Sequence, residues 1–310
     1  MYNLIMSIRN FLFDKGWGLK QQAFDVPLIS VGNLSMGGTG KTPHTEYLVK
    51  LLQQSSKDVA VLSRGYGRAT KGFRLATDAS TASEIGDEPR QIKQKFPDCT
   101  VAVCEKRVVG MQQLIAKRQE EGKTTDNWVV VLDDAFQHRY IKPGFSILLT
   151  DYARPYYADR VLPWGRLRES AEGAQRADVI IVTKCPKHLS ATNAEQIRAK
   201  LAPLPTQEVF FTCFDYGNPY SASDCQETEL PHNALVLTGI AKPQPLYAYL
   251  EAHGVEIKTL AFPDQIGYNI SKWEKRGIHY DLQCASPRHQ RHPGQPGGGR
   301  VLYFQRPAGL

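Results

Sequence analysis

The sequence contains no Cys-x-x-Cys pair and no cysteine spacing typical of a zinc site. This absence argues against a structural zinc module and against a dithiol redox motif. The cysteines are therefore predicted to be free, buried thiols in a reducing compartment. They are Cys99, Cys104, Cys185, Cys213, Cys225 and Cys284.

The chain also lacks an uninterrupted apolar run of about 20 residues, the length needed to cross a membrane as a helix. The apolar stretch Leu4–Phe13 is interrupted by Arg9 and Asn10, which argues against an export signal as well. Residues 1–20 are predicted to form an amphipathic helix, which either docks on the protein core or lies in a membrane interface. The apolar face of this helix contains Leu4, Ile8, Phe11 and Leu12.

Neither apolar nor charged residues are scarce: 42% of the 310 residues are hydrophobic and 22% are charged, as in soluble globular proteins of one or two domains. The excess of 38 Lys and Arg over 31 Asp and Glu gives a net charge of +7, which suits a phosphorylated substrate, an anionic lipid surface or nucleic acid. Because no recognisable nucleic-acid-binding module is present, we expect no nucleic-acid partner.

Apolar, β-branched runs alternate with amphipathic stretches up to about residue 260. The amphipathic stretches include predicted helices over Thr42–Gln54 and Lys106–Glu121. This alternation predicts an α/β fold with a mostly parallel sheet and flanking helices, in which ligands bind beyond the carboxyl ends of the strands. The predicted strands are Pro27–Val31, Val59–Ser63, Val101–Cys104, Trp128–Leu132, Ser146–Thr150, Val179–Thr183, Val209–Thr212 and Ala234–Thr238.

A glycine-rich segment follows the first predicted strand and precedes a helical pattern, as in the phosphate-binding loop (P-loop) of nucleotide-binding proteins. Glycines let backbone N–H groups converge on phosphate oxygens, and the helix N-terminus favours negative charge. Lys41 is predicted to reach the β- and γ-phosphates, and the Thr42 hydroxyl to bind Mg²⁺. Ser35 departs from the motif, which has glycine there, and a turn that merely links strand to helix is the alternative. The predicted nucleotide-binding residues are Ser35, Met36, Gly37, Gly38, Thr39, Gly40, Lys41 and Thr42.

A P-loop predicts an acidic partner at the end of a second buried strand. The apolar run Trp128–Leu132 is followed directly by Asp133 and Asp134, which are predicted to lie near Mg²⁺. The alternative is a solvated Asp-Asp turn without a ligand.

Three further polar clusters supply what in-line phosphoryl transfer requires, namely a base, a carboxylate near the metal and arginines such as Arg64. Each cluster alone is open to another interpretation: Asp87 or Glu88 could equally cap a helix, and His138 is better explained as a structural histidine. The clusters are Ser63–Arg68, Gly86–Pro89 and Leu167–Glu169.

Together these segments resemble the tetraacyldisaccharide 4'-kinase family, the bacterial lipid A 4'-kinases, over roughly residues 1–264. The resemblance implies an ATP- and Mg²⁺-dependent kinase that phosphorylates the 4'-hydroxyl of tetraacyldisaccharide 1-phosphate. It also implies a peripheral protein on the cytosolic face of the inner membrane. The segments that carry the resemblance are Val31–Thr42, Ser63–Gly67, Gly86–Pro89, Asp133–Arg139 and Leu162–Glu169.

The resemblance also implies roles for individual residues. Asp87 would act as the general base toward the sugar hydroxyl. The membrane-resident substrate favours the interfacial interpretation of Leu4–Phe13, with Arg9, Lys15 and Lys20 near anionic head groups. The implied candidates for ordering Mg²⁺, its waters or the substrate are Asp133, Asp134, Glu88 and Glu169. The implied phosphate or substrate contacts are Arg107, Gln137, His138 and Arg168, together with Arg64.

The last part of the chain departs from the family pattern. At Phe262–Gln265 the family has a segment whose histidine is expected to pair with the catalytic aspartate, whereas here Gln265 has no proton to exchange. After Asp264 the chain has seven Lys or Arg against two Asp or Glu, and a changed reading frame near Gln265 is one explanation. A catalytically impaired kinase homologue is therefore an alternative function.

The domains predicted from the sequence are an N-terminal helix (1–20), a P-loop kinase domain (21–230), a smaller C-terminal α/β domain (231–284) and a disordered or atypical tail (285–310). A nucleotide-switch GTPase or a metallochaperone is the rival class. Guanine-binding proteins usually have Asn-Lys-x-Asp after a late strand, whereas Val182–Pro186 lacks the final aspartate, which argues against guanine.

Overall fold

The computed structural model describes residues 2–214, 216, 219–221, 228–238, 243–261, 282–284 and 300–304. Two compact units divide between Phe214 and Asp215. The first unit contains the predicted P-loop and the polar clusters.

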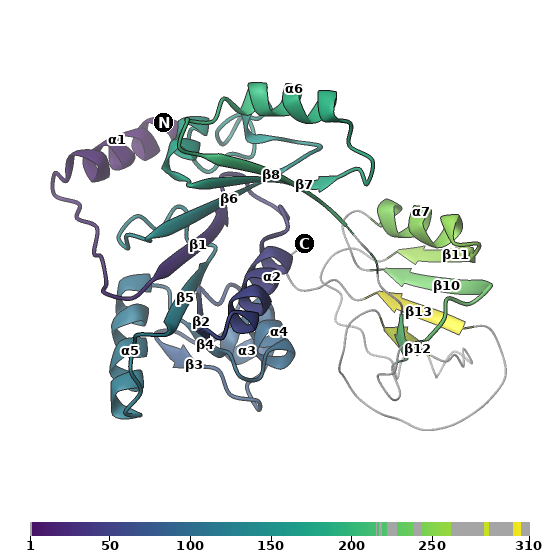
Figure 1. The fold of residues 1–310 in the computed structure, drawn as a ribbon, viewed down its shortest axis with the longest axis horizontal. Coiled ribbons are helices and arrows are strands. Elements are labelled where there is room, and N and C mark those ends of the chain that lie inside the picture. Colours follow the sequence, from purple (N-terminus) through teal and green to yellow (C-terminus); the bar gives the residue numbers. More distant parts are fainter. Residues whose placement is uncertain are drawn as a thin grey trace. The chain divides into compact units, whose positions relative to one another are not determined.

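The first unit is built on an eight-stranded sheet that is parallel except for its edge strand β3 (Figure 1). Each of the seven runs predicted as strands in this unit forms a strand, so the predicted α/β fold is confirmed. Strand β3 was not predicted, because a strand of two residues has no periodic pattern. In sheet order the strands are β3 (Arg74–Leu75), β4 (Thr100–Val103), β2 (Asp58–Ser63), β5 (Trp128–Asp133), β1 (Leu28–Asn33), β6 (Phe145–Asp151), β7 (Val179–Cys185) and β8 (Glu208–Cys213).

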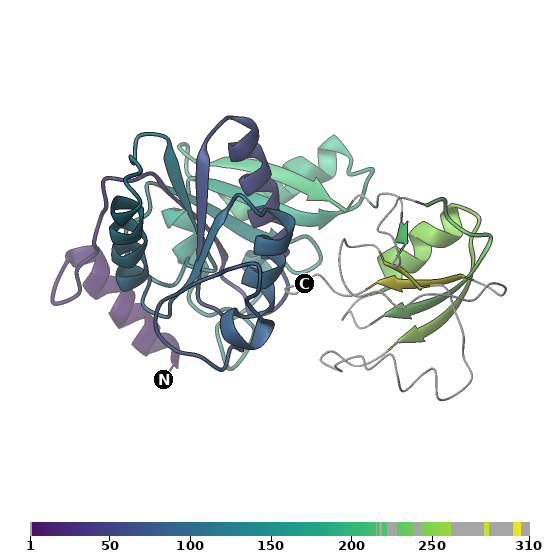
Figure 2. The same ribbon diagram turned by 90° about the horizontal axis from the view of Figure 1, so that it is seen from below.

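Helices cover both faces of this sheet, with α5 on one face and α2 and α4 on the other (Figures 1 and 2). The predicted helices are present as α2, α5 and, within the predicted residues 1–20, α1. The helices of the first unit are α1 (Tyr2–Lys15), α2 (Lys41–Gln54), α3 (Ala82–Ile85), α4 (Asp87–Lys95), α5 (Arg107–Glu120) and α6 (Ala191–Leu201), with 3₁₀ turns at Tyr156–Ala158 and Ala171–Arg176.

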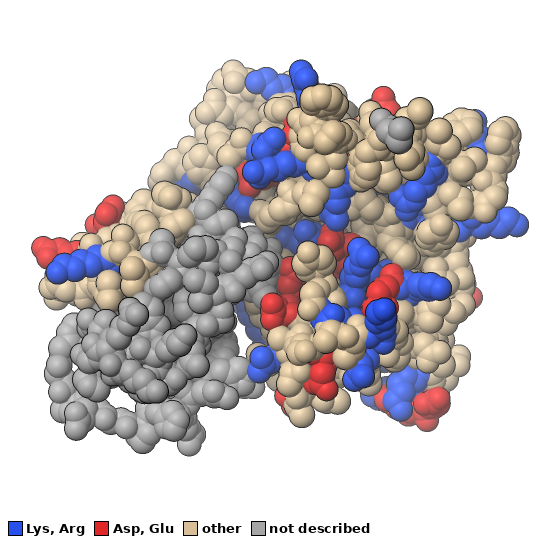
Figure 3. All heavy atoms as spheres, turned by 180° about the vertical axis from the view of Figure 1, so that it is seen from behind, with Lys and Arg blue, Asp and Glu red and all other residues tan. Residues whose placement is uncertain are grey.

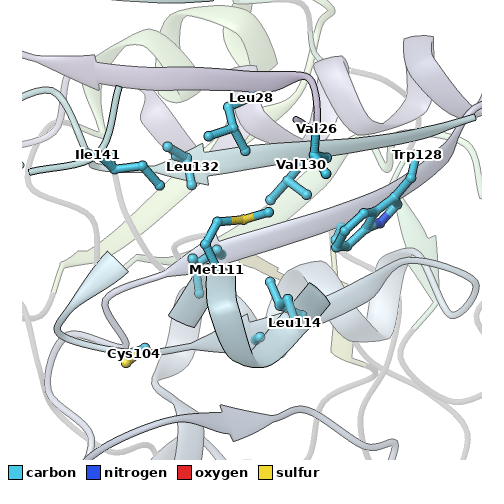
Figure 4. Packing of buried hydrophobic residues seen from close by; sticks show 13 residues of the cluster. Val26, Leu28, Cys104, Met111, Leu114, Trp128, Val130, Leu132 and Ile141 are labelled. Carbon is cyan, nitrogen blue, oxygen red and sulfur yellow. The ribbon is translucent and has the colours of Figure 1, made fainter. Parts of the chain in front are cut away.

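Strand β5 contributes side chains to the cores on both faces of the sheet. Val130 and Leu132 pack with Met111 and Leu114 of α5 (Figure 4). The intervening Val131 belongs to the opposite core, which α2 and α4 cover. Because successive side chains of a strand point to opposite faces, a strand buried on both sides has to be apolar throughout. This requirement explains the continuous apolar run before Asp133.

Strand β1 lies at the point where the chain changes direction across the sheet. It pairs with β5 on one side and with β6 on the other. After β1 the chain crosses to β2, whereas β6, β7 and β8 extend the opposite half of the sheet. In open α/β sheets the carboxyl end of a strand at such a switch point is where ligands bind. The loop after β1 is the predicted P-loop.

The second unit contains a five-stranded sheet in the order β11-β10-β13-β12-β9, and the predicted strand over Ala234–Thr238 is present in it as β10. Helix α7 (Gln244–Ala252) packs on β10 through Leu246 and Leu250. The sheet includes β9, which precedes the boundary expected near residue 230, and β13, which lies within the tail expected to be disordered or atypical. The segment Phe262–Gln265 lies outside the described residues. The strands are β9 (Tyr220–Ser221), β10 (Asn233–Thr238), β11 (Glu256–Ala261), β12 (Leu282–Cys284) and β13 (Arg300–Phe304).

Helix α1 contacts the first unit through its polar residues. Asn10 donates a hydrogen bond to Glu169, and Asp14 pairs with Arg139. Only Phe13 among its apolar side chains is buried. The helix therefore docks on the rest of the unit, as one of the two interpretations expected, but not through its apolar face: Leu4, Ile8 and Phe11 are exposed, and Leu12 is half-buried.

Three of the cysteines, Cys99, Cys104 and Cys185, are free and buried as predicted. Cys213 is exposed at the end of β8, so the prediction of burial is wrong there.

Among the helices within the described ranges, none is both long and apolar enough to cross a membrane. On the face seen in Figure 3, basic and acidic side chains of the first unit are interspersed.

Gly32 in β1 allows a close approach that any side chain would block. A Cβ atom at this position would lie 2.7 Å from Phe136 Cβ and 3.0 Å from the Phe136 backbone nitrogen. Because backbone cannot rotate away, we expect Gly32→Ala to destabilise the protein by about 1–3 kcal/mol. Urea denaturation measures this change.

The matched control is Gly144→Ala. A Cβ at Gly144 would meet nothing closer than the Leu28 carbonyl oxygen at 3.7 Å. Equal stabilities of the two variants would contradict the steric explanation for Gly32.

Candidate active site

The P-loop has the backbone geometry that phosphate binding requires. Gly37 and Gly40 have φ angles of 106° and 85°, which residues with a Cβ rarely adopt. Gly40 is the N-cap of α2, so Lys41 and Thr42 begin the helix. Ser35 pairs through its backbone with Leu167, and such extended pairing does not need glycine. Because of this pairing, the loop can form although Ser35 stands where the motif has glycine.

The buried side chain of Asn33, at the end of β1, connects the loop to two other segments. Its Nδ2 donates to Ser35 O (2.8 Å) and Thr39 Oγ1 (2.7 Å), and its Oδ1 accepts from Arg168. The backbone carbonyl of Asn33 accepts from Gln137 Nε2 at 2.7 Å. These bonds fix the P-loop against the segments that follow β5 and precede the 3₁₀ turn at Ala171.

Asp133 and Asp134 differ in their surroundings. Asp133 is 1% exposed and accepts from the hydroxyls of Thr45 (3.2 Å) and Ser63 (3.1 Å). Burial and the neighbouring Asp134 carboxylate raise the pKa of Asp133. Burial also acts against ionisation of Asp134, but Lys41 and Arg168 hold the pKa of that carboxyl below its usual value. A solvated turn, the alternative interpretation, does not fit a buried Asp133.

Lys41 and Arg168 bring positive charge to the same carboxylate. Lys41 Nζ lies 3.8 Å from Asp134 Oδ1, and Arg168 Nη2 lies 3.0 Å from it. At 3.8 Å the pair is longer than a hydrogen bond, so the flexible ammonium can move toward a phosphate without breaking one.

Arg107 is buried and supports the chain after β5. Its guanidinium donates to the carbonyl oxygens of Cys104 (3.2 Å), Asp133 (3.1 Å) and Asp134 (3.4 Å). Burial lowers the pKa of Arg107 to about 10, so the group stays charged at neutral pH. Its backbone N–H donates to His138 Nε2 at 3.3 Å. Arg107 therefore holds backbone in this structure, in addition to the substrate contact that the resemblance implies.

Glu169 is 1% exposed, and both of its carboxylate oxygens accept hydrogen bonds from the protein. Oε2 accepts from Asn10 at 2.7 Å, and Oε1 accepts from Gln137 at 3.1 Å and from Arg176 at 2.8 Å. In this arrangement Glu169 links α1 to the segment after β5. A role in ordering Mg²⁺, its waters or the substrate stays a prediction.

Asp87 and Glu88 begin α4, and Gly86 is the N-cap residue, so the alternative of an aspartate cap does not apply. The Asp87 side chain is exposed at the rim of a hollow of about 270 Å³. Arg64 is also exposed, and its charge acts on both Arg107 and His138. The hollow is lined by Tyr66, Gly67, Ala69, Ala82, Ser83, Gly86 and Asp87.

The oxygen donors beside the P-loop fit a magnesium ion. Thr42 contributes a buried hydroxyl at the start of α2, and Asp133 and Asp134 contribute carboxylates. Mg²⁺ prefers such oxygens and takes few protein ligands when nucleotide phosphates supply the others. Within the described ranges no three His, Cys, Asp or Glu side chains form a metal-binding cluster. The donor set therefore suits an ion shared with phosphate rather than a cage made by protein alone.

Several residues of the site were not identified from the sequence. Of these residues, only Asn33 could have been recognised as a site residue from the sequence, because it is polar, ends a buried strand and lies beside the loop. Asn10 and Thr45 carry no individual signal in the sequence, and Ser63 stands out only as the first residue of the Ser63–Arg68 cluster. Only tertiary contacts reveal their partners.

The parallel sheet, the P-loop at its switch point and the adjacent carboxylates define an α/β P-loop nucleotide-binding protein. The family model for tetraacyldisaccharide-1-P 4'-kinase matches residues 1–279. The chain belongs to this family. The assignment decides against the GTPase-switch and metallochaperone hypotheses.

Similar proteins support the same assignment. The chain is 44% identical over 308 residues to the tetraacyldisaccharide 4'-kinase of Bacteroides thetaiotaomicron, covering 95% of this chain and 77% of that protein. It is 49% identical over 267 residues to the enzyme of the same name from Flavobacterium johnsoniae, covering 85% and 76%. The crystal structure of LpxK from Aquifex aeolicus in complex with ATP superposes with a TM-score of 0.70 at 28% identity, covering 99% of this chain and 85% of that one.

His138 provides a test of the electrostatics around the site. Burial and the positive charges of Arg107, Arg9 and Arg64 lower the pKa of His138 to about 4. An unfolded histidine has a pKa of about 6.5, so the unfolded state binds more protons between these values. The stability that neutral His138 provides is therefore complete above about pH 6.5 and is lost as pH falls toward 4.

We expect His138→Gln to show a smaller drop in melting temperature from pH 7 to pH 5 than the wild type. The glutamine carbonyl can still accept the hydrogen bond from Arg107 N. His188→Gln, which changes an exposed histidine, serves as the control. An equal drop in the wild type and His138→Gln would show that His138 does not titrate in this way.

Proposed function

We propose that this protein transfers the γ-phosphate of ATP to the 4'-hydroxyl of tetraacyldisaccharide 1-phosphate. The observation that carries the proposal is the network around Asn33, which joins the P-loop, Gln137 and Arg168 at one end of the sheet. Membership of the family and the ATP complex of the Aquifex aeolicus relative support it. The impaired-homologue alternative depends on Gln265, which lies outside the described residues.

The nucleotide phosphates would lie on the P-loop, with Lys41 and Arg168 providing positive charge. Mg²⁺ would be held by Thr42 together with Asp133 or Asp134. When bound, the ion would neutralise charge on the β- and γ-phosphate oxygens. Thr45 and Ser63 keep the Asp133 carboxylate oriented through their hydroxyl groups.

Asp87 is the proposed general base because its exposed carboxylate stands at the rim of a hollow large enough for part of a sugar. The 4'-oxygen forms a bond to the γ-phosphorus, the bond from that phosphorus to the ADP oxygen breaks, and the proton passes to the Asp87 carboxylate. Positive charge at Lys41 stabilises the oxygens on which negative charge builds up.

We also propose that α1 binds the cytosolic surface of the inner membrane. The polar residues of the helix bind the first unit, and exposed apolar side chains remain on the other side. Lys15 near the helix end suits anionic head groups. These exposed apolar residues are Leu4, Ile5, Ile8, Phe11 and, just after the helix, Trp17.

The kinase proposal is tested by following labelled γ-phosphate from ATP into tetraacyldisaccharide 1-phosphate in detergent micelles with the full chain. We expect Asp87→Asn to lower kcat by about 10²–10⁴, because the amide cannot accept the proton. Asp98→Asn, which changes an exposed aspartate in a loop, is the control. Full activity of Asp87→Asn would remove Asp87 from its assigned role. A wild-type chain that binds ATP and forms no product would favour the impaired homologue.

Membrane binding is tested by sedimentation with anionic liposomes. We expect the double variant Leu4→Ser, Ile8→Ser to bind at least about ten-fold more weakly, because it removes apolar surface that would enter the lipid. The polar contacts that dock α1 are retained in this variant. Leu204→Ser removes an exposed leucine elsewhere in the unit and should bind as the wild type does. Unchanged sedimentation of the double variant would refute the proposal.

A further inference from the structure

The carboxyl end of β7 lies against the P-loop, and its contacts are not explained by the functions assigned above. Thr183 and Lys184 lie in the segment Val182–Pro186, which corresponds to the Asn-Lys-x-Asp motif of guanine-binding proteins; the sequence suggests no other role for them. The pairing of β7 with β8 is irregular between Val182 and Cys185, and Lys184 has a φ of 60°. The irregularity allows two consecutive side chains to approach the same loop.

Both side chains donate hydrogen bonds to P-loop carbonyl groups. Lys184 Nζ donates to Gly38 O and lies 3.0 Å from Asp151 Oδ2. The Thr183 hydroxyl lies 2.9 Å from Thr39 O and 3.2 Å from Thr150 O. Thr183 is buried, so its hydroxyl has no water to replace these partners.

The orientation of a peptide carbonyl also fixes an N–H group. In a planar trans peptide the C=O and the following N–H point in opposite directions. Holding the Thr39 carbonyl toward β7 therefore turns the Gly40 N–H away from β7. In a P-loop, phosphate oxygens are bound by the backbone N–H groups, so the position of these carbonyls decides whether the loop fits its ligand.

We propose that Thr183 and Lys184 are positioning residues that hold the P-loop in its phosphate-binding conformation. Asp151 orients Lys184 by pairing with it. Asn33 holds the same loop from the end of β1, so the loop is held from the ends of two strands, β1 and β7. Without the β7 contacts the loop populates other conformations, and the apparent dissociation constant for ATP rises by the inverse of the competent fraction.

The inference rests on the proposed function only in that ATP is the nucleotide. It is therefore tested first by calorimetric titration of the full chain with ATP, which requires no lipid acceptor. If the wild type binds ATP but does not phosphorylate the lipid, the kinase proposal fails. The ATP affinities of the wild type and of the β7 variants still decide the role of Thr183 and Lys184.

The decisive pair of variants is Thr183→Val and Thr183→Ser. Valine keeps the shape of threonine and removes the hydroxyl, whereas serine keeps the hydroxyl. We expect Thr183→Val to weaken ATP binding about five-fold, the size of one hydrogen bond, and Thr183→Ser to bind nearly as the wild type does. Equal affinity of Thr183→Val and the wild type, or equal weakening by valine and serine, would overturn the role of Thr183.

For Lys184 we expect Lys184→Met to weaken ATP binding about ten-fold or more, because the lost donor is charged. Lys184→Arg should regain part of the affinity, and Lys200→Met, an exposed lysine on α6, should bind as the wild type does. In kinase assays the KM for ATP should rise while the KM for the lipid stays unchanged. Equal increases in both KM values, with a lowered melting temperature, would indicate a merely structural role and overturn the proposal.

Discussion

The hydrogen bonds of one buried residue, Asn33, hold the candidate active site together. Its amide nitrogen binds Ser35 and Thr39 within the P-loop, and its oxygens accept from Gln137 and Arg168. Three segments that are distant in the sequence thus share one side chain and its backbone carbonyl. Because a buried amide left without partners destabilises the fold by about 1–3 kcal/mol, each segment depends on the others being in place.

The charges around this residue are arranged so that a phosphate can be accepted without leaving a buried charge unpaired. Asp133, deep in the sheet, is held by the hydroxyl groups of Thr45 and Ser63. Asp134 is more accessible and carries the loose pair with Lys41. Release of Lys41 toward a phosphate leaves Asp134 with Arg168 as partner. Asp134, which loses Lys41 as a partner, therefore keeps Arg168 as a second one.

The strands, the P-loop and the Asp133–Asp134 pair could be predicted because each is a pattern within one continuous stretch of chain. The roles of Arg107 and Glu169 could not, because their partners come from other segments: Arg107 holds carbonyls at the end of β5, and Glu169 binds Asn10 of α1. Helix α1 shows the same limit. Its pattern identifies an apolar face, but a pattern does not tell whether protein or lipid covers that face.

The contacts of α1 connect the proposed membrane-binding surface to the candidate active site. Tyr2 donates to the Arg168 carbonyl, Arg9 to the Gln137 carbonyl and Asn10 to Glu169. The helix proposed to lie in the membrane surface is therefore bonded to the segments of Gln137 and Arg168, for which the family resemblance implies phosphate or substrate contacts. An α-helix with its side chains is only about 10–12 Å wide, so these segments lie within one helix width of the apolar face. A substrate with its acyl chains in lipid and its sugar at the protein would meet both surfaces at once.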